Sequence, residues 1–162
     1  MIEVKDQLTG KKHPKNELYR AENGKYYTSK EKYEEHKKNM EYRDKCTEKM
    51  YELINYSAFM KIPTFWYKRL KDWEDYGYEI VYMTIVDLSD TLKKYAYKGF
   101  KSEAHRINYL AAIIENNLND TLKLVEERKR VAKKSEENKG GIIENTNRKQ
   151  PSKDISQFIE EE

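Results

Sequence analysis

The side chains that most often carry catalysis are few and scattered in this chain. Three histidines, His13, His36 and His105, and a single cysteine, Cys46, are spread over most of its 162 residues. None of them stands in a G-x-S-x-G, Walker or H-E-x-x-H motif, and the sequence shows no paired-carboxylate arrangement. The sequence therefore favours a non-enzymatic protein, although a nuclease site built from dispersed acids would leave no such motif.

The stretch KYYTSKEKYEEH, residues 25–36, is typical of a β-hairpin that runs into a helix. This layout resembles the treble-clef zinc modules, which take two ligands before the hairpin and two from the first helical turns. The matching positions here are Asp6, Thr9, Thr28 and Lys32. Because zinc prefers thiolate or imidazole ligands in tetrahedral sites, we expect no metal here, and we expect no other cofactor.

A zinc site elsewhere in the chain is also disfavoured. His36 and Cys46 are ten residues apart, which places them about 15 Å from each other along a helix. They cannot share one ion. The treble-clef resemblance implies instead a zinc-ribbon-like unit whose metal is replaced by the packing of Leu8, Leu18, Tyr19, Tyr26, Tyr27 and Tyr33.

Basic and aromatic side chains are interleaved in the stretch KIPTFWYKRLK. Lysine and arginine suit the phosphates of a single-stranded nucleic acid, and its bases stack on aromatic rings with roughly 1–3 kcal/mol per base. Trp66 shares a helical stripe with Leu70 and Trp73, so we expect it in the core. The residues expected to contact a nucleic acid or another partner are therefore Lys61, Phe65, Tyr67, Lys68, Arg69 and Lys71.

A second basic run lies near the end of the last predicted helix. It consists of Arg128, Lys129, Arg130, Lys133 and Lys134. These side chains suit phosphates or an acidic protein surface, with strong salt sensitivity. They equally suit a solvated helix end, because cations there favour the helix dipole and can pair with Glu126 and Glu127 one turn away.

The C-terminal residues form a third candidate surface. Ile155, Phe158 and Ile159 are flanked by the acids Asp154 and residues 160–162. This pattern is typical of a short docking peptide, in which apolar anchors give affinity and acids steer the peptide to a basic groove. The peptide is expected to dock on this chain or on a neighbouring one, unless it is an inert solubilising tail.

Composition limits the class of protein. The chain is 38% charged and 37% hydrophobic, and its mean hydropathy is −1.10. The 32 basic and 29 acidic residues leave a net charge of +3, so only the distribution of charge argues for a polyanion partner. No apolar run approaches the roughly 20 residues that span a bilayer. We expect a cytoplasmic protein without a membrane partner or an internal disulfide.

The spacing of apolar residues predicts a mainly α-helical fold. We expect a bundle of about four helices with a small N-terminal β-hairpin and a C-terminal tail. Asn23 and Gly24 supply the positive φ angles of the hairpin turn. Thr28 is expected to begin the first helix as the N-cap of a capping box with Glu31.

Three further helices and the domain boundaries follow from the same spacing. The second helix begins at Pro63 or Thr64, the third spans residues 81–95, and the fourth opens at Ser102. After Val125 the apolar face fades, which predicts a solvated extension. The predicted segments are an N-terminal hairpin unit, a helical domain, and a linker with an acidic and apolar tail, at residues 1–28, 29–137 and 138–162.

Tyr109, Ile113 and Asn117 follow one another at one-turn spacing in INYLAAIIENN. The stretch resembles the Y-x-x-x-I-x-x-x-W signature of the C-terminal domain of DnaD-type replication-initiation proteins, which occur in Gram-positive bacteria and their phages, with asparagine in place of the tryptophan. The similarity spans Phe65 to Leu124 and implies a small helical module that binds DNA or replication proteins. The spacing also suits one flank of an ordinary amphipathic helix.

The size, the composition and this signature together resemble small phage or mobile-element proteins of Gram-positive bacteria. Such a protein is expected to bind DNA or a nucleoprotein in the cytoplasm of the host cell, without catalysis and in relation to replication. The alternative is a phage-encoded inhibitor of the anti-CRISPR type, which blocks a host defence protein by direct binding. The long last helix suits either a monomer or a two-fold homodimer.

Overall fold

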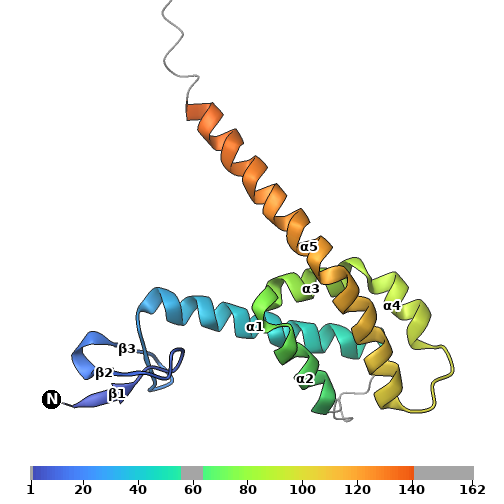
Figure 1. The fold of residues 1–162 in the computed structure, drawn as a ribbon, viewed down its shortest axis with the longest axis horizontal. Helices are drawn as coiled ribbons and strands as arrows, with labels where there is room; N and C mark the ends of the chain where they lie inside the picture. The colour runs from blue at the N-terminus through green and yellow to red at the C-terminus, as the bar shows by residue number, and fades with distance from the viewer. Residues whose placement is uncertain (1, 56–63, 141–162) are drawn as a thin grey trace, which may run out of the picture. The chain divides into compact units, whose positions relative to one another are not determined.

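The computed structural model describes residues 2–55 and 64–140 (Figure 1). It confirms a mainly helical fold with a small antiparallel hairpin at the N-terminus. The helices are α1 (Lys30–Leu53), α2 (Thr64–Asp72), α3 (Tyr78–Asp87), α4 (Ser89–Ala96) and α5 (Glu103–Gly140). The chain divides by internal contacts between Lys123 and Leu124, within α5. The segment boundaries expected from the sequence stay predictions, and Lys61, Ile155, Phe158 and Ile159 lie outside the described residues.

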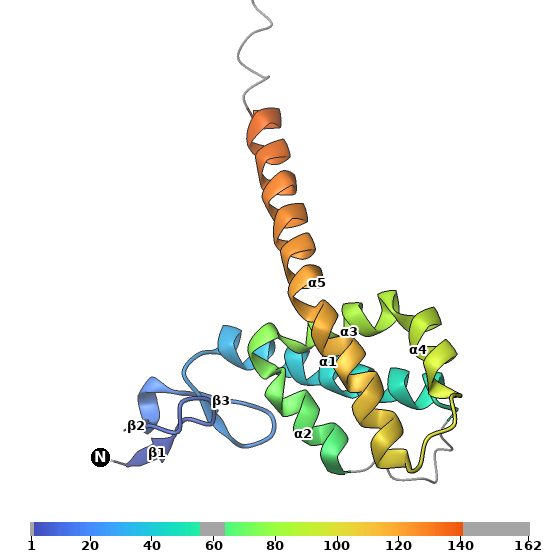
Figure 2. The same cartoon turned by 45° about the vertical axis from the view of Figure 1, so that its right-hand side comes forward.

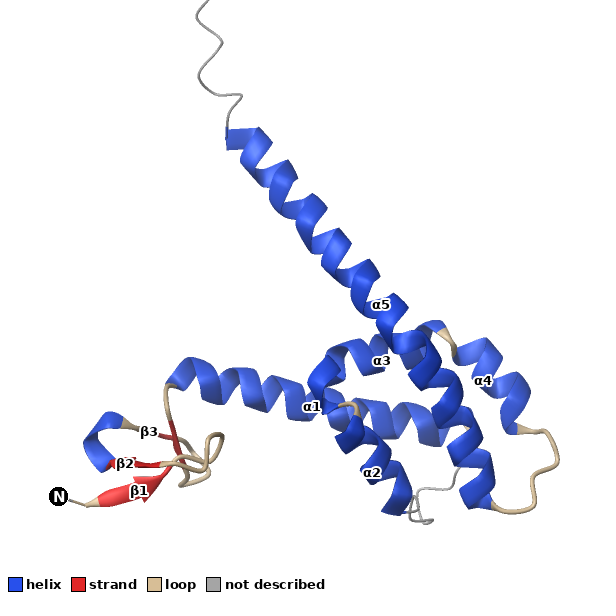
Figure 3. Ribbon diagram, viewed as in Figure 1, coloured by secondary structure: helices blue, strands red, loops and turns tan. Residues whose placement is uncertain are grey.

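Two short antiparallel hairpins precede the helices (red in Figure 3). Their strands are β1 (Glu3–Lys5), β2 (Lys12–Pro14), β3 (Tyr19–Arg20) and β4 (Tyr26–Tyr27), with a 3-10 turn at Lys15–Glu17. Strand β3 pairs with β4 across a turn in which Gly24 has a φ of 76°, which confirms the hairpin predicted from Asn23 and Gly24. The positive φ predicted for Asn23 is wrong, because Asn55 is the one non-glycine residue of the described chain with a positive φ. The pairing of β1 with β2 is a second hairpin, and a parallel bridge between Asp6 and Tyr26 joins the two.

Few apolar side chains are buried in the N-terminal unit, residues 2–28. Tyr27 packs against Tyr33 of α1 with ring centroids 5.0 Å apart, and Ala21 is buried beside them. Leu8 is 40% exposed, so the packing predicted for it is wrong. A short two-residue strand buries only one of its faces, and little apolar area is available to hold this unit together.

A buried carboxylate occupies the centre of the N-terminal unit. Asp6 accepts hydrogen bonds from the amide of Leu8 at 2.9 Å, from Oγ1 of Thr9 at 3.0 Å and from Oγ1 of Thr28 at 2.5 Å. Three of the four positions that match treble-clef ligands therefore lie together, while Lys32 forms an ion pair within α1. Hydrogen bonds to a carboxylate join the first hairpin to the start of α1, while Tyr19 and Tyr27 pack against Tyr33 of α1 as predicted.

The surroundings of Asp6 stabilise its charged form. Burial by itself raises the pKa of this carboxyl group, but the hydrogen bonds from Thr28, Leu8 and Thr9, with the nearby His13, outweigh burial. The pKa of Asp6 consequently lies below its ordinary value of 3.8. The ionised group accepts all three hydrogen bonds, so the folded N-terminal unit and the charged carboxylate depend on each other.

Helix α1 begins one residue later than the predicted capping box. Ser29 is its N-cap, and the Ser29 hydroxyl accepts a hydrogen bond from the amide of Lys32 at 3.2 Å. The hydroxyl of Thr28 donates instead to Asp6. The prediction of Thr28 as the N-cap is therefore wrong, because the buried carboxylate takes the Thr28 hydroxyl and the next residue satisfies the free amides of the helix.

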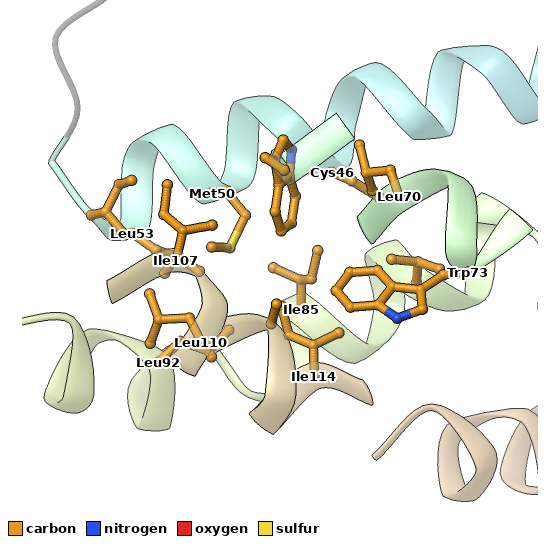
Figure 4. Close-up of a cluster of buried hydrophobic side chains, with 14 of the residues drawn as sticks. Cys46, Met50, Leu53, Leu70, Trp73, Ile85, Leu92, Ile107, Leu110 and Ile114 are labelled. Carbon is orange, nitrogen blue, oxygen red and sulfur yellow. The ribbon is translucent and has the colours of Figure 1, made fainter. Parts of the chain in front are cut away.

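The helical core lies between α1 and the helices that pack on it (Figure 4). Trp66 and Trp73 meet edge to face with ring centroids 6.0 Å apart, and the indole of Trp66 donates to Oγ1 of Thr47 on α1 at 3.1 Å. The predicted stripe of Trp66, Leu70 and Trp73 is thus confirmed. The buried members of this core are Cys46, Met50, Leu53, Ile54, Trp66, Leu70, Trp73, Tyr78, Val81, Ile85, Leu92, Ala96, Ile107, Leu110, Ala111, Ile114 and Leu118.

The single third helix predicted from the sequence is two helices, α3 and α4, which meet at Leu88. The hydroxyls of Thr84 and Ser89 donate to the carbonyl oxygens of Ile80 and Ile85, one turn earlier. Such bonds bend helices because they compete for carbonyl groups that the helix uses. The bend changes the direction of the chain between two helices that are both buried on one side.

Helix α5 follows its prediction closely. The hydroxyl of Ser102 accepts a hydrogen bond from the amide of His105 at 3.2 Å, which caps the helix start. Its buried face extends to Thr121, and Leu124 and Val131 are 47% and 56% exposed. The solvated extension is therefore confirmed for the described side chains. Within residues 2–55 and 64–140, no helix combines the length and the apolarity that a membrane crossing requires.

Candidate nucleic-acid interface

The most reactive side chain of the described residues is not placed for chemistry. The thiol of Cys46 is fully buried and donates to the carbonyl oxygen of Tyr78 at 3.6 Å. Burial raises its pKa to about 12, so the thiol stays protonated at neutral pH, which is typical of a structural cysteine. In the described part of the chain, no three His, Cys, Asp or Glu residues are grouped so that they could hold a metal ion.

The residues predicted on α2 point in different directions. Phe65 packs against the helical core and is half-buried, whereas Tyr67 is 41% exposed. Lys68 and Lys71 are exposed. Arg69 forms an ion pair with Glu115 of α5, with 3.6 Å between Nη1 and Oε2, so this guanidinium is engaged within the protein.

The positive charge of α2 is also offset nearby. Asp72, Glu74 and Asp75 follow within the next turn, and all three are exposed. Three acids thus stand directly after the three cations of α2. A phosphate that approaches this helix meets a surface with little net charge, which weakens the predicted attraction.

The predicted basic run of α5 is wholly exposed and contains no acid, but acids flank it on both sides. Arg128, Lys129, Arg130, Lys133 and Lys134 all face solvent. Nη2 of Arg130 lies 2.8 Å from a carboxylate oxygen of Glu127, so this arginine is paired along its own helix. Exposed pairs of this kind contribute little to stability, and they fit a solvated helix face.

A different aromatic and basic surface lies where α4 ends and α5 begins. Figure 2 shows α4 beside the N-terminal part of α5, and in Figures 1 and 2 α2 lies on the opposite side of that part. We call this surface the α4–α5 patch. It consists of Lys94, Tyr95, Lys98, Phe100, Lys101, His105 and Tyr109.

The rings of the α4–α5 patch form a continuous row. The ring centroids of His105 and Phe100 are 5.9 Å apart, those of Phe100 and Tyr109 are 5.6 Å apart, and those of Tyr109 and Tyr95 are 5.8 Å apart. Nζ of Lys98 lies 4.2 Å from the centroid of the Tyr95 ring, in cation–π contact. His105 is exposed and Tyr109 is 40% exposed, so the row is open to solvent at these two residues.

The charge of the α4–α5 patch is uninterrupted. Residues 91–102 contain four lysines and no acid. Lys94, Lys98 and Lys101 are exposed and take part in no ion pair within the described residues. Glu103, the first acid after the segment, is paired with Arg106. Phosphates that approach the row of rings therefore meet the positive charge of this segment, and the exposed Asp90 lies one turn before Lys94 on α4.

The sequence holds a signal for this patch in KKYAYKGFK, where lysines and aromatic residues are interleaved. The spacing of apolar residues places this segment at the end of a predicted helix and gives no sign of a joint surface, because the rings meet only when α4 and α5 pack. Of the three residues of the DnaD-like signature, Tyr109 lies in the patch and Ile113 is half-buried against the core. The side chain of Asn117 donates to the carbonyl oxygen of Ile113 at 2.8 Å and is half-buried.

The α4–α5 patch thus differs from both predicted basic segments by its contiguous rings. Its cations are unpaired, as are Lys68 and Lys71 of α2 and all of the α5 run except Arg130, within the described residues. Exposed cations beside exposed rings are the side chains that hold single-stranded nucleic acids, in which phosphates and base faces are both accessible. Comparison with known proteins adds no family to this geometry: no protein-family model, curated protein or solved structure matches the chain.

Proposed function

We propose that this protein is a non-enzymatic DNA-binding protein that contacts DNA through the α4–α5 patch. The single observation that supports this most is the row of four rings flanked by three lysines without acidic partners. The proposal keeps the expectation of a small phage or mobile-element protein that acts on DNA or a nucleoprotein in relation to replication. It moves the contact surface from α2 to the junction of α4 and α5.

Electrostatics distinguishes the α4–α5 patch from the other two basic segments. Lysines that neutralise phosphates release counterions, so the affinity falls as the salt concentration rises, with a slope set by the number of contacts. Three unpaired lysines correspond to a slope contribution of roughly 2 for a single strand. Lys68, Lys71 and the α5 run lie among acids and contribute less to such a slope.

The test compares three charge-reversed variants by fluorescence anisotropy with a labelled oligonucleotide over a range of salt concentrations. Changing Lys94, Lys98 and Lys101 together to glutamate should abolish binding at moderate salt and lower the salt slope by roughly 2. Two control variants, K68E/K71E and R128E/K133E/K134E, should retain most of the affinity. Arg69 stays unchanged in the first control because its loss would leave Glu115 unpaired.

The outcomes separate the possible partners. Binding that is lost in a control variant but kept in K94E/K98E/K101E would contradict the proposed surface. Absence of oligonucleotide binding at low salt would contradict the proposed function itself. Retention by one host protein from a Gram-positive lysate, together with that absence, would favour the alternative of an inhibitor that binds a defence protein.

A further inference from the structure

We infer that the α4–α5 patch selects single-stranded over double-stranded nucleic acid, with Tyr109 as the side chain on which a base stacks. This inference rests on the proposed function, because it assumes that the patch contacts a nucleic acid. It adds the form of strand that is bound and the residue that recognises it. Neither follows from the lysines, because phosphates are present on single strands and duplexes alike.

The exposed rings of the patch can stack on the base faces of a single strand but not on those of a duplex. In a duplex each base is covered on both faces by its neighbours, and only the base edges are accessible in the grooves. In a single strand a base can leave its neighbours and stack on an aromatic side chain. The two exposed rings of the row, His105 and Tyr109, therefore gain free energy from a single strand alone, while the lysines attract both forms.

Within the row, Tyr109 is the ring best placed to receive a base. It lies between Phe100 and Tyr95, whose ring centroids are 5.6 and 5.8 Å away. These contacts restrict its motion, so little side-chain entropy is lost when a base stacks on it. Tyr95 is less suited, because the ammonium group of Lys98 lies 4.2 Å over its ring. His105 extends the row at its exposed end.

Lys98 lies close to the rings in space, and Lys94 and Lys101 lie close to them along the chain. Lys98 is held over Tyr95, and Lys101 directly follows Phe100. Lys94 lies on α4, and Lys98 directly follows Tyr97, the C-cap of this helix. A phosphate bound by these side chains places the adjacent base within reach of the rings. Charge and stacking therefore act on the same nucleotides.

Tyr67 of α2 provides a matched comparison for Tyr109. The two tyrosines have nearly the same exposure, 41% and 40%. Each lies on a helix of the same helical core, and Tyr67 also has a cation beside it, since the guanidinium of Arg43 lies 5.8 Å from its ring centroid. Tyr67 lacks the uninterrupted basic segment that surrounds Tyr109. Loss of either ring should disturb the fold to a similar and small extent.

The experiment measures the affinity of the full chain for an oligothymidine and for a duplex of equal length at one salt concentration. We expect the single strand to bind more tightly. Replacement of Tyr109 by leucine, which keeps an apolar side chain against Phe100, should weaken binding of the single strand by roughly 5- to 150-fold, the effect of one stacked base. Binding of the duplex should change little, and Tyr67→Leu should affect neither ligand.

Tyr109→Phe provides the conservative variant, because it keeps the ring and should keep the affinity. Thermal unfolding of each variant, followed by circular dichroism, shows whether the fold is retained. Equal binding of single strand and duplex, or an equal loss for both in Tyr109→Leu, would overturn the inference. If K94E/K98E/K101E loses binding while Tyr109→Leu does not, only the stacking role fails. If K94E/K98E/K101E still binds, the proposed function fails first.

Discussion

The N-terminal unit and the helical core are held together by different physical means. In the helical core, large apolar side chains such as Trp66 and Leu110 are fully buried. In the N-terminal unit, the buried apolar residues are Ala21 and Tyr27, and the centre of the unit is the carboxylate of Asp6. The first part is stabilised by apolar burial and the second by a buried polar cluster.

The difference follows from size. A unit of fewer than about 40 residues cannot bury enough apolar area to fold by the hydrophobic effect alone, and it generally needs a cross-link or a metal. The hydrogen bonds from Thr9 and Thr28 meet at Asp6, and the bond from Thr28 spans 22 residues of the sequence. They tie the loop after β1 to the start of α1, which is the geometric effect of a cross-link. Three mutational or pH experiments test this contrast.

Substitution of Trp66 by alanine should have the largest effect. The indole is fully buried, contacts Trp73 edge to face and donates to Thr47. Removing a buried tryptophan ring costs about 3–5 kcal/mol in transfer and cavity free energy. We expect the free energy of unfolding to fall by this amount in urea titrations followed by far-UV circular dichroism. Tyr67→Ala, at the neighbouring exposed position, should cost less than about 1 kcal/mol.

A loss of similar size for both substitutions would show that the burial of Trp66 does not dominate this region. A cooperative loss of all helical signal in Trp66→Ala would agree with one core shared by α1, α2 and α5.

Substitution of Asp6 by alanine should have a smaller effect, confined to the N-terminal unit. It leaves the amide of Leu8 and the hydroxyls of Thr9 and Thr28 without their acceptor. A buried donor that loses its partner costs roughly 1–3 kcal/mol, although hydroxyl groups can turn to water. We expect a loss of roughly 2–3 kcal/mol, seen as faster amide hydrogen exchange in residues 2–28 with the helical core unchanged.

The matched control for this substitution is Asp44→Ala on the exposed side of α1. It removes the same charge without a buried partner and should leave amide exchange unaffected. Equal exchange in Asp6→Ala and in the unmodified protein would refute the role of Asp6.

Of the three changes, lowering the pH should have the smallest effect, a partial destabilisation of the N-terminal unit. The pKa of Asp6 in the folded protein lies below the ordinary value of 3.8. Its contribution is therefore complete above the pKa of the unfolded chain and is lost as the pH falls through the lower, folded value. Protonation keeps part of the hydrogen bonding, so it should cost less than Asp6→Ala. The protection factors of the amides of residues 2–28, which correct for the intrinsic pH dependence of exchange, should fall below about pH 4.

Asp6→Asn provides the control for the acid effect, because an amide does not titrate. The exchange of its N-terminal amides should show no corresponding acid step. The same acid step in Asp6→Asn and in the unmodified protein would assign the effect to other carboxyl groups.

Local sequence patterns were sufficient for much of the fold. The spacing of Trp66, Leu70 and Trp73, the turn at Asn23 and Gly24, and the cap at Ser102 each depend on neighbouring residues, and each is confirmed. The predictions that failed depend on distant partners. Thr28 is not the N-cap because Asp6, which lies 22 residues earlier, takes its hydroxyl.

The sequence predicted the types of residue in the candidate interface but not the helices that carry them. An interleaved set of cations and rings was expected to contact nucleic acid, and such a set exists on the α4–α5 patch. The helix chosen from the sequence, α2, has Arg69 engaged with Glu115 and Phe65 against the core. Neither contact can be read from the local sequence, since both partners belong to other elements of the fold.

Periodicity, turn residues and charge runs thus predict the helices and their polar faces, because these features depend on interactions within a few residues. The row from His105 through Phe100 and Tyr109 to Tyr95, like the cluster around Asp6, exists only after elements from separate parts of the chain have packed together. Which cations stay unpaired, which rings stay open and which carboxylate is buried are consequences of that packing, because each depends on a side chain remote in the sequence.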